Sequence, residues 1–415
     1  MFRRILFFLT VVVLSLFTTT AFAGIIELPQ TGQTKCYNSA GAEIPCAGTG
    51  QDGEIWAGIP WPDPRFSTNA DTTVTDNLTG LAWVPDGNLM ISRDPGWDQD
   101  NTVDDGIVTW EHALDYVAKL NAENYLGYSD WRLPNFIELE SLFHAGYKEE
   151  NCGGSACSTN AAWLNTQGFT NVKTSIYWSS TTYAPSYDSG ADEAWHVNMA
   201  TGGTDDTYKG YYRYVWPVRS GQTGIVQLPK TGQTTSYYVG DDGDLQMGVA
   251  WPEPRFNDNC NGTVTDNLTG LMWLKDANCI QTQYPSFDND YTYGDGRVTW
   301  QHALDFVQGI NNGTYLNCGT GYSDWRLTNR KELKSLTDYS KYEPNLPSGH
   351  PFTNVPLGMY DYYWMSTTAP YTGYAWVTGM WCGCMGGYNK SSSRYHVWPV
   401  RSAGPDDYYG DNDCD

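Results

Sequence analysis

The sequence predicts an α+β fold made of two tandem domains, each with two helices and a small, irregular antiparallel sheet. Two observations predict it: six motifs occur twice in the same order, and each copy combines helical periodicity with short strand-like runs. For example, Trp61-Pro-Asp-Pro-Arg-Phe66 returns as Trp251-Pro-Glu-Pro-Arg-Phe256. The repeat of roughly 190 residues far exceeds the about 20–50 residues of solenoid repeats. Each copy should therefore fold around its own core.

The first 23 residues predict a cleaved export signal. Arg3 and Arg4 precede an apolar stretch, and Ala21-Phe-Ala23 supplies a small-residue cleavage site. No later run of about 18 apolar residues could span a bilayer. The protein is therefore expected to be secreted or held at the cell surface, and a periplasmic location is also compatible. The predicted domains are 24–221 and 222–404, followed by an acidic tail at 405–415.

Two helices are predicted in each copy. The first shows apolar residues at helical spacing behind a capping threonine, Thr109 or Thr299. Its core positions are Trp110, Ala113, Leu114, Val117 and Leu120 in one copy, and Trp300, Ala303, Leu304, Val307 and Ile310 in the other. The second helix begins with a capping box, Asn135 with Glu138, repeated as Asn329 with Glu332. Arg132 and Arg326, flanked by Asp130 and Asp324, are expected to form buried ion pairs that orient this helix.

The charge balance excludes several classes of ligand. The formal net charge is −23, and it becomes −25 once the two arginines of the signal are removed. Such a field repels phosphate and sulfate polymers. Nucleic acids and sulfated polyanions are therefore not expected as partners, whereas cations and neutral sugars remain compatible.

Ten cysteines follow the signal, and an even number in an exported protein predicts disulfides. The predicted pairs are Cys36 with Cys46, Cys152 with Cys157, and Cys279 with Cys318, which bracket the first helix of the second copy. The remaining cysteines cannot be assigned from the sequence. They are Cys260, Cys382, Cys384 and Cys414, and Cys382 and Cys384 are too close in sequence for an easy bridge.

An acidic loop precedes the first helix in both copies. Alternating carboxylates on such a loop can converge on Ca²⁺, the one cofactor that the sequence suggests. The candidate ligands are Asp98, Asp100 and Asp105 in one copy, and Asp288, Asp290 and Asp295 in the other. The alternative is a solvated turn, because Asp and Gly dominate turns for conformational reasons. A second acidic turn, Asp52-Gly-Glu54 with its counterpart Asp242-Gly-Asp244, is a weaker candidate of the same kind.

Aromatic residues are the other candidates for binding. The tryptophans of the repeated motifs are expected in the cores, because each copy needs the same packing. The variable segments 183–195 and 371–381 differ between copies, and loops on a rigid scaffold commonly carry binding residues. The candidate rings are Tyr183, Tyr187, Trp195, Tyr371, Tyr374, Trp376 and Trp381. If Trp195 and Trp376 are instead buried, a purely structural role gains weight.

The repeated motifs resemble the Lcl C-terminal domain family, named after a collagen-like bacterial adhesin. The resemblance lies in Thr263 to Trp273, Thr299 to Leu304, Ser323 to Leu333, Tyr363 to Thr368 and Val397 to Arg401, and in their counterparts in the first copy. It implies two tandem domains of the C-type-lectin-like superfamily, and extracellular recognition as the function. The adhesin's sulfated glycosaminoglycan ligand does not transfer to so acidic a chain. Collagen repeats are missing too, so trimerisation is not implied and the question of a homo-oligomer stays open.

Three functions remain after these observations. The first is a secreted recognition or adhesion protein without catalytic activity, which binds a glycan or a protein through its variable aromatic loops. The second is a structural subunit of an extracellular layer, fibre or appendage. The third is an oxidase similar to formylglycine-generating enzymes, which use cysteines near their C-terminal end. Only the second copy has cysteines there, and no Ser-His-Asp, phosphate-loop or zinc motif occurs in the chain.

Overall fold

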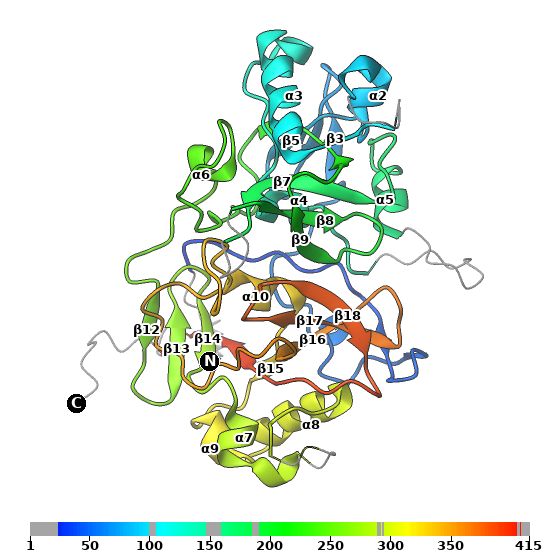
Figure 1. The fold of residues 1–415 in the computed structure, drawn as a ribbon. Coiled ribbons are helices and arrows are strands. Elements are labelled where there is room, and N and C mark those ends of the chain that lie inside the picture. Colours follow the sequence, from blue (N-terminus) through cyan, green and yellow to red (C-terminus); the bar gives the residue numbers. More distant parts are fainter. Residues whose placement is uncertain are drawn as a thin grey trace, which may run out of the picture.

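The computed structural model describes residues 24–98, 105–146, 159–184, 191–288, 292, 294–404 and 407. It confirms an α+β protein with two copies of one domain, which lie one above the other in Figure 1. We call residues 61–220 body 1 and residues 251–404 body 2. The segments that precede them, 24–60 and 224–250, are called arm 1 and arm 2.

The predicted helices are present in both bodies. The first is α3 (Trp110–Ala122) in body 1 and α8 (Trp300–Asn311) in body 2, and their predicted core positions are buried. The second is α4 (Phe136–Ser141) and α10 (Arg330–Ser335), each with the complete capping box. The expectation of two helices per copy is nevertheless too low, because short helices also form in the loops. They are α2 (Leu89–Arg93), η1 (Pro95–Trp97), η2 (Tyr125–Gly127), α5 (Thr159–Leu164), α7 (Cys279–Gln283), η3 (Pro285–Phe287) and α9 (Leu316–Gly319).

Each body contributes to two sheets rather than one. The first sheet has the order β11-β5-β4-β3 in body 1 and β12-β13-β14-β19-β15 in body 2. Its strands are β3 (Phe66–Thr68), β4 (Val74–Asp76), β5 (Leu81–Trp83), β11 (Val218–Ser220), β12 (Phe256–Asp258), β13 (Thr263–Asp266), β14 (Leu271–Leu274), β15 (Arg326–Leu327) and β19 (Pro399–Ser402). The last strand of each body joins this sheet: β11 pairs with β5 in body 1, and β19 pairs with β14 in body 2.

The second sheet runs through both bodies. Its order is β16-β17-β18-β9-β8-β7-β10-β6, and its strands change body where β18 pairs with β9. The strands are β6 (Ile107–Val108), β7 (Ile176–Thr182), β8 (Glu193–Asn198), β9 (Thr204–Tyr208), β10 (Arg213–Tyr214), β16 (Tyr362–Thr368), β17 (Tyr374–Gly379) and β18 (Met385–Asn389). The hairpin β7–β8 shifts register between Trp178 and Thr182, and β16–β17 does so between Trp364 and Thr368. The two hairpins therefore share an irregularity at equivalent positions.

The arms are exchanged between the copies. Arm 1 carries β1 (Cys36–Tyr37), β2 (Glu43–Ile44) and α1 (Asp52–Ile55), and it packs on body 2, where the blue segment lies in Figure 1. Arm 2 carries α6 (Asp242–Leu245) and packs on body 1. The Ile26 amide donates to Leu268 O at 2.9 Å, and the Val226 amide donates to Leu78 O at 2.9 Å. Residues 24–221 and 222–404 are therefore repeats in sequence but not separate lobes in space.

The repeated tryptophans form the cores, as predicted. All eight are buried: Trp83, Trp131, Trp178, Trp216, Trp273, Trp325, Trp364 and Trp398. The arginine of the repeated Asp-Trp-Arg-Leu motif also orients the second helix, although its partner differs from the flanking aspartate. Arg132 pairs with Glu138, the glutamate of the capping box, and Asp130 pairs with Arg219 instead. Arg326 with Glu332 and Arg401 with Asp324 repeat this arrangement.

Two of the predicted disulfides are confirmed, Cys36 with Cys46 and Cys279 with Cys318. Cys152 and Cys157 lie outside the described residues. The expectation that Cys382 and Cys384 do not bridge one another is wrong, because they form a disulfide. Gly383 between them has a φ of 68°, and this left-handed conformation turns the chain so that the two Cα atoms lie 5.1 Å apart. Cys260 is also disulfide-bonded.

Candidate functional site

A pocket of about 360 Å³ opens where the two bodies meet. Its walls come from the loop after β16, from β17 and β18, and from the turn between β8 and β9 of the other body. The lining residues are Thr201, Gly203, Ala369, Pro370, Tyr371, Tyr374, Trp376, Gly386 and Gly387. We call this cavity the junction pocket, because neither body alone supplies all of its walls.

Two tyrosines from the variable segment of body 2 border the junction pocket. Tyr371 is 56% exposed and Tyr374 is 38% exposed. Their ring centroids lie 5.9 Å apart, with 52° between the ring planes. Rings that are accessible and tilted towards each other can contact a ligand from two directions.

Glycines leave another part of the wall without side chains. A Cβ atom at Gly387 would lie 3.0 Å from the Cβ of Ala369, so only glycine fits there without a shift. Gly203, on the side of body 1, has more room, because its added Cβ would find no atom closer than 3.4 Å. Beside these glycines lies Trp376, whose buried indole nitrogen has no hydrogen-bond partner among the described residues. The wall thus offers a flat apolar surface, with the Trp376 ring almost entirely buried beside it.

The corresponding strand of body 1 differs in charge. Gly387 pairs with Trp376 across β17 and β18, and the residue that pairs with the equivalent Trp195 is Asp206. The preceding position is Gly386 in body 2 and Asp205 in body 1. The glycine wall is therefore a feature of the second copy.

The expectation that Trp195 and Trp376 are exposed anchors for a ligand is wrong. Trp195 is fully buried and Trp376 is 2% exposed, because each ring packs against the other body. The ring centroid of Trp195 lies 5.3 Å from that of Tyr339, and Trp376 lies 5.8 Å from Phe143. These two tryptophans therefore pack at the interface between the two bodies of the same chain.

The other aromatic candidates have mixed positions. Tyr183, another candidate ring for binding, is buried against Trp195. Trp381 is partly buried, and Tyr187 lies outside the described residues. Of the candidates within the described residues, Tyr371, Tyr374 and Trp376 line one pocket.

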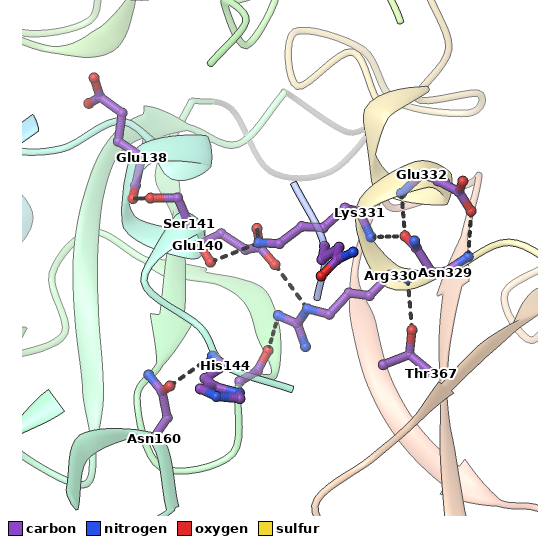
Figure 2. Close-up of polar contacts among 12 residues, drawn as sticks. Glu138, Glu140, Ser141, His144, Asn160, Asn329, Arg330, Lys331, Glu332 and Thr367 are labelled. Carbon is purple, nitrogen blue, oxygen red and sulfur yellow. Dashed lines mark hydrogen bonds and ion pairs between the residues drawn. The ribbon is translucent and has the colours of Figure 1, made fainter. Parts of the chain in front are cut away.

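A buried ion cluster joins the two bodies near the junction pocket. The carboxylate of Glu140 on α4 accepts from Arg330 Nε at 2.9 Å and from Lys331 Nζ at 2.6 Å, both on α10. Figure 2 shows the two cations reaching across from body 2 to this single acid. Burial by itself would raise the pKa of Glu140, but the charges and hydrogen bonds of Lys331 and Arg330 lower it below its ordinary value.

A third cation of α10, Lys334, lies in an aromatic cage at the same interface. Its Nζ donates to the carbonyl of Gly383 at 2.5 Å and lies 5.0–5.5 Å from ring centroids of both bodies. These rings belong to Phe136, Trp195 and Tyr339. Burial lowers the pKa of Lys334 to about 7.

The second acidic turn seats the arms on the bodies through buried hydrogen bonds. Asp52 accepts hydrogen bonds from Thr31 Oγ1 at 2.6 Å and from Thr367 Oγ1 at 2.7 Å. Asp242 repeats this with Thr231 and Thr181 at 2.6 and 2.7 Å. Burial raises the pKa of Asp52 to about 6 and that of Asp242 to about 7. Sequence reasoning missed this role, although the recurrence of the turn in both copies was a signal for it.

The loops proposed for calcium use their carboxylates to hold turns. Asp98 accepts from the amide of Gly106 at 2.9 Å, and Asp288 accepts from the amide of Gly296 at 3.0 Å. Asp105 and Asp295 accept from the amides of Ile107 and Arg297, and Asp295 also pairs with the Arg297 guanidinium. Asp100 and Asp290 lie outside the described residues.

Two further searches of the described residues are negative. Within the described ranges, no group of three or more His, Cys, Asp or Glu side chains is placed to hold a metal ion, so the calcium interpretation gains no support. None of the helices in the same part of the chain has both the length and the apolar character needed to cross a membrane.

A comparison with known families supports the repeat. The family model of the Lcl C-terminal domain matches residues 72–219 and 262–401. Both matches lie inside the bodies, and both arms lie outside them. No curated protein and no solved structure matches the chain.

Proposed function

Because the chain belongs to the Lcl C-terminal domain family, we propose that it is an extracellular recognition protein without catalytic activity, which binds a neutral glycan at the junction pocket. The observation that carries this proposal is the pair of accessible rings, Tyr371 and Tyr374, beside the glycine wall. A sugar ring presents a flat C–H face that stacks on an aromatic ring, and a wall without side chains lets the sugar approach closely. The export signal predicted in the first 23 residues supports a site outside the cytoplasm.

The chemistry of the pocket favours a neutral ligand over a charged one. The described residues that line the pocket include no Lys, Arg, Asp or Glu. The net charge of −23 also repels sulfated or phosphorylated polymers. A protein partner that inserts an apolar side chain is the competing outcome.

A glycan array tests the proposal, with purified protein probed against neutral and sulfated sugars. Tyr371→Ala and Tyr374→Ala should each weaken binding to a neutral glycan by about ten-fold or more, if the rings are anchors. Gly203→Leu should also weaken binding while leaving both tyrosines in place, because its side chain would fill the pocket. Tyr360→Ala is the matched control, since Tyr360 is 71% exposed but does not line the pocket. Binding that survives all three pocket variants would refute the proposal.

The burial of Trp195 and Trp376 favours a second candidate, a structural subunit of an extracellular layer or fibre. Each tryptophan is buried between the two bodies and so does not face solvent. The second sheet runs through both bodies and joins them into one continuous unit. Electron microscopy of concentrated protein tests this candidate. Ordered filaments or lattices, together with an empty glycan array, would place the structural role first.

A further inference from the structure

We infer that the two bodies form an exclusive pair, in which the face of each body accepts the other copy and rejects a second copy of itself. The inference is independent of the junction pocket's ligand. It rests on an interface whose geometry is repeated in both bodies while its charges are not.

The helices α4 and α10 face each other with equivalent positions in reciprocal contact. Both begin at a capping asparagine, so Phe136 corresponds to Arg330, Ile137 to Lys331, and Glu140 to Lys334. Glu140 reaches the first two residues of α10, namely Arg330 and Lys331. In the reciprocal contact, Lys334 Nζ lies 5.0 Å from the ring centroid of Phe136, the first residue of α4. The same position on each helix therefore contacts the start of the other helix.

The charges make these reciprocal contacts unequal. Body 2 supplies three buried cations, and body 1 supplies one buried acid and two apolar side chains. In a pair of two copies of body 2, Lys334 would face Arg330 and Lys331 twice, with no acid between them. In a pair of two copies of body 1, each Glu140 would face Phe136 and Ile137 and would be buried without a cation. A buried charge that loses its partner is strongly destabilising, so both self-pairings are disfavoured.

The turn between β8 and β9 and the turn between β17 and β18 also favour pairing of the two different bodies. The carbonyl of Gly202 in body 1 accepts from Arg330 Nη2 at 2.6 Å, and the carbonyl of Gly383 in body 2 accepts from Lys334 Nζ at 2.5 Å. Both donors come from body 2, whose α10 therefore serves the turns of both copies. Two copies of body 1 would leave both turn carbonyls without these donors.

A nicked form of the full chain tests the inference. Residues 221–223 are exposed, so a protease site inserted between Gln222 and Thr223 can be cut in the folded protein. Each described disulfide lies within one half. The cut protein is unfolded in urea with its disulfides intact, and both halves are then refolded together by dilution and examined by native mass spectrometry.

The expected product is a 1:1 complex of the two different halves, without pairs of identical halves. A mixture that includes pairs of identical halves at the statistical ratio would overturn the inference. So would halves that fold, as judged by near-ultraviolet circular dichroism, but stay apart.

Charge variants provide a second, separate test. Glu140→Lys should weaken re-association of the halves by at least about 100-fold, because three buried cations would then face a fourth. Adding Arg330→Glu and Lys331→Glu to that variant should restore pairing, since the acid and the cations have then exchanged sides. Glu111→Lys is the control, because Glu111 is exposed on α3 of the same body. Re-association of the Glu140→Lys halves at the parent's affinity would also contradict the inference.

Discussion

The hydroxyl of Thr367 donates a hydrogen bond of 2.7 Å to the carboxylate of Asp52, although the two residues are 315 positions apart in the chain. Thr181 and Asp242 make the equivalent contact at 2.7 Å over 61 positions. In both cases the acid is the first residue of a short arm helix, and the hydroxyl belongs to a long strand of the body on which that arm lies. The same threonine–aspartate contact, which we call an anchor, therefore holds each arm to its body, although the sequence separation differs between the two copies.

These anchors should make stability depend on pH. Both acids have folded-state pKa values, about 6 and about 7, above their ordinary value of 3.8. The folded state therefore binds more protons than the unfolded state, and the stabilisation is complete below pH 4 and lost as the pH rises through 6 and 7. From pH 8 to pH 5, each acid should add roughly 1–3 kcal/mol to the free energy of unfolding.

Urea unfolding of the parent and of Asp52→Asn and Asp242→Asn measures this effect. Each variant should show a flatter dependence than the parent between pH 5 and pH 8, because an amide does not titrate. Asp63→Asn, at an exposed position, should keep the parent's dependence. Parallel curves for the parent and both anchor variants would contradict the burial of these charges.

Replacing Trp195 or Trp376 with alanine should destabilise the whole protein. Each ring is buried between the bodies, and removing a buried indole typically costs about 3–5 kcal/mol. Chemical denaturation followed by tryptophan fluorescence measures this loss. Tyr371→Ala should cost less than about 1 kcal/mol, because that ring is exposed. Similar stabilities for all three variants would mean that the bodies do not bury these tryptophans.

Truncating Glu140 alone should cost more than removing its whole ion cluster. Glu140→Ala leaves Arg330 and Lys331 buried without their acid, and breaking such a pair typically costs about 3–5 kcal/mol. The triple variant Glu140→Leu, Arg330→Met and Lys331→Met removes every charge and should recover most of that loss. Urea midpoints of the single and triple variants make the comparison. A triple variant less stable than the single one would show that the charges contribute net stability.

The disulfide between Cys279 and Cys318 should stabilise body 2 through the unfolded state. It spans 39 positions, and closing a loop of this size is worth roughly 3–4 kcal/mol. The double variant Cys279→Ser and Cys318→Ser should lose that amount in thermal or urea unfolding. Mass spectrometry of the intact parent, with thiols blocked before digestion, should show both cysteines oxidised and linked to each other.

The sequence alone determined the elements whose signals are local. The helix at Trp110 follows from apolar spacing, the helix at Asn135 from its capping box, and the burial of the repeated tryptophans from their recurrence in both copies. The bridge between Cys279 and Cys318 also followed from sequence position and an oxidising environment. Each of these features depends on neighbouring residues or on the repeat itself.

The tertiary structure decided how the copies are combined. Trp195 lies in a variable segment, which suggests a binding surface, but only the packing of the bodies shows that its partner is Tyr339 of the same chain. The sequence placed Asp52 in an acidic turn that was a weaker candidate for calcium. The hydroxyl that donates to it lies 315 positions away, so no local pattern indicates that contact. Exchange of the arms leaves no local pattern in the sequence, since both arms carry the same Leu-Pro-x-Thr-Gly-Gln-Thr motif and a short acidic turn. The choice of body depends on long-range contacts, and those contacts arise only in the folded chain.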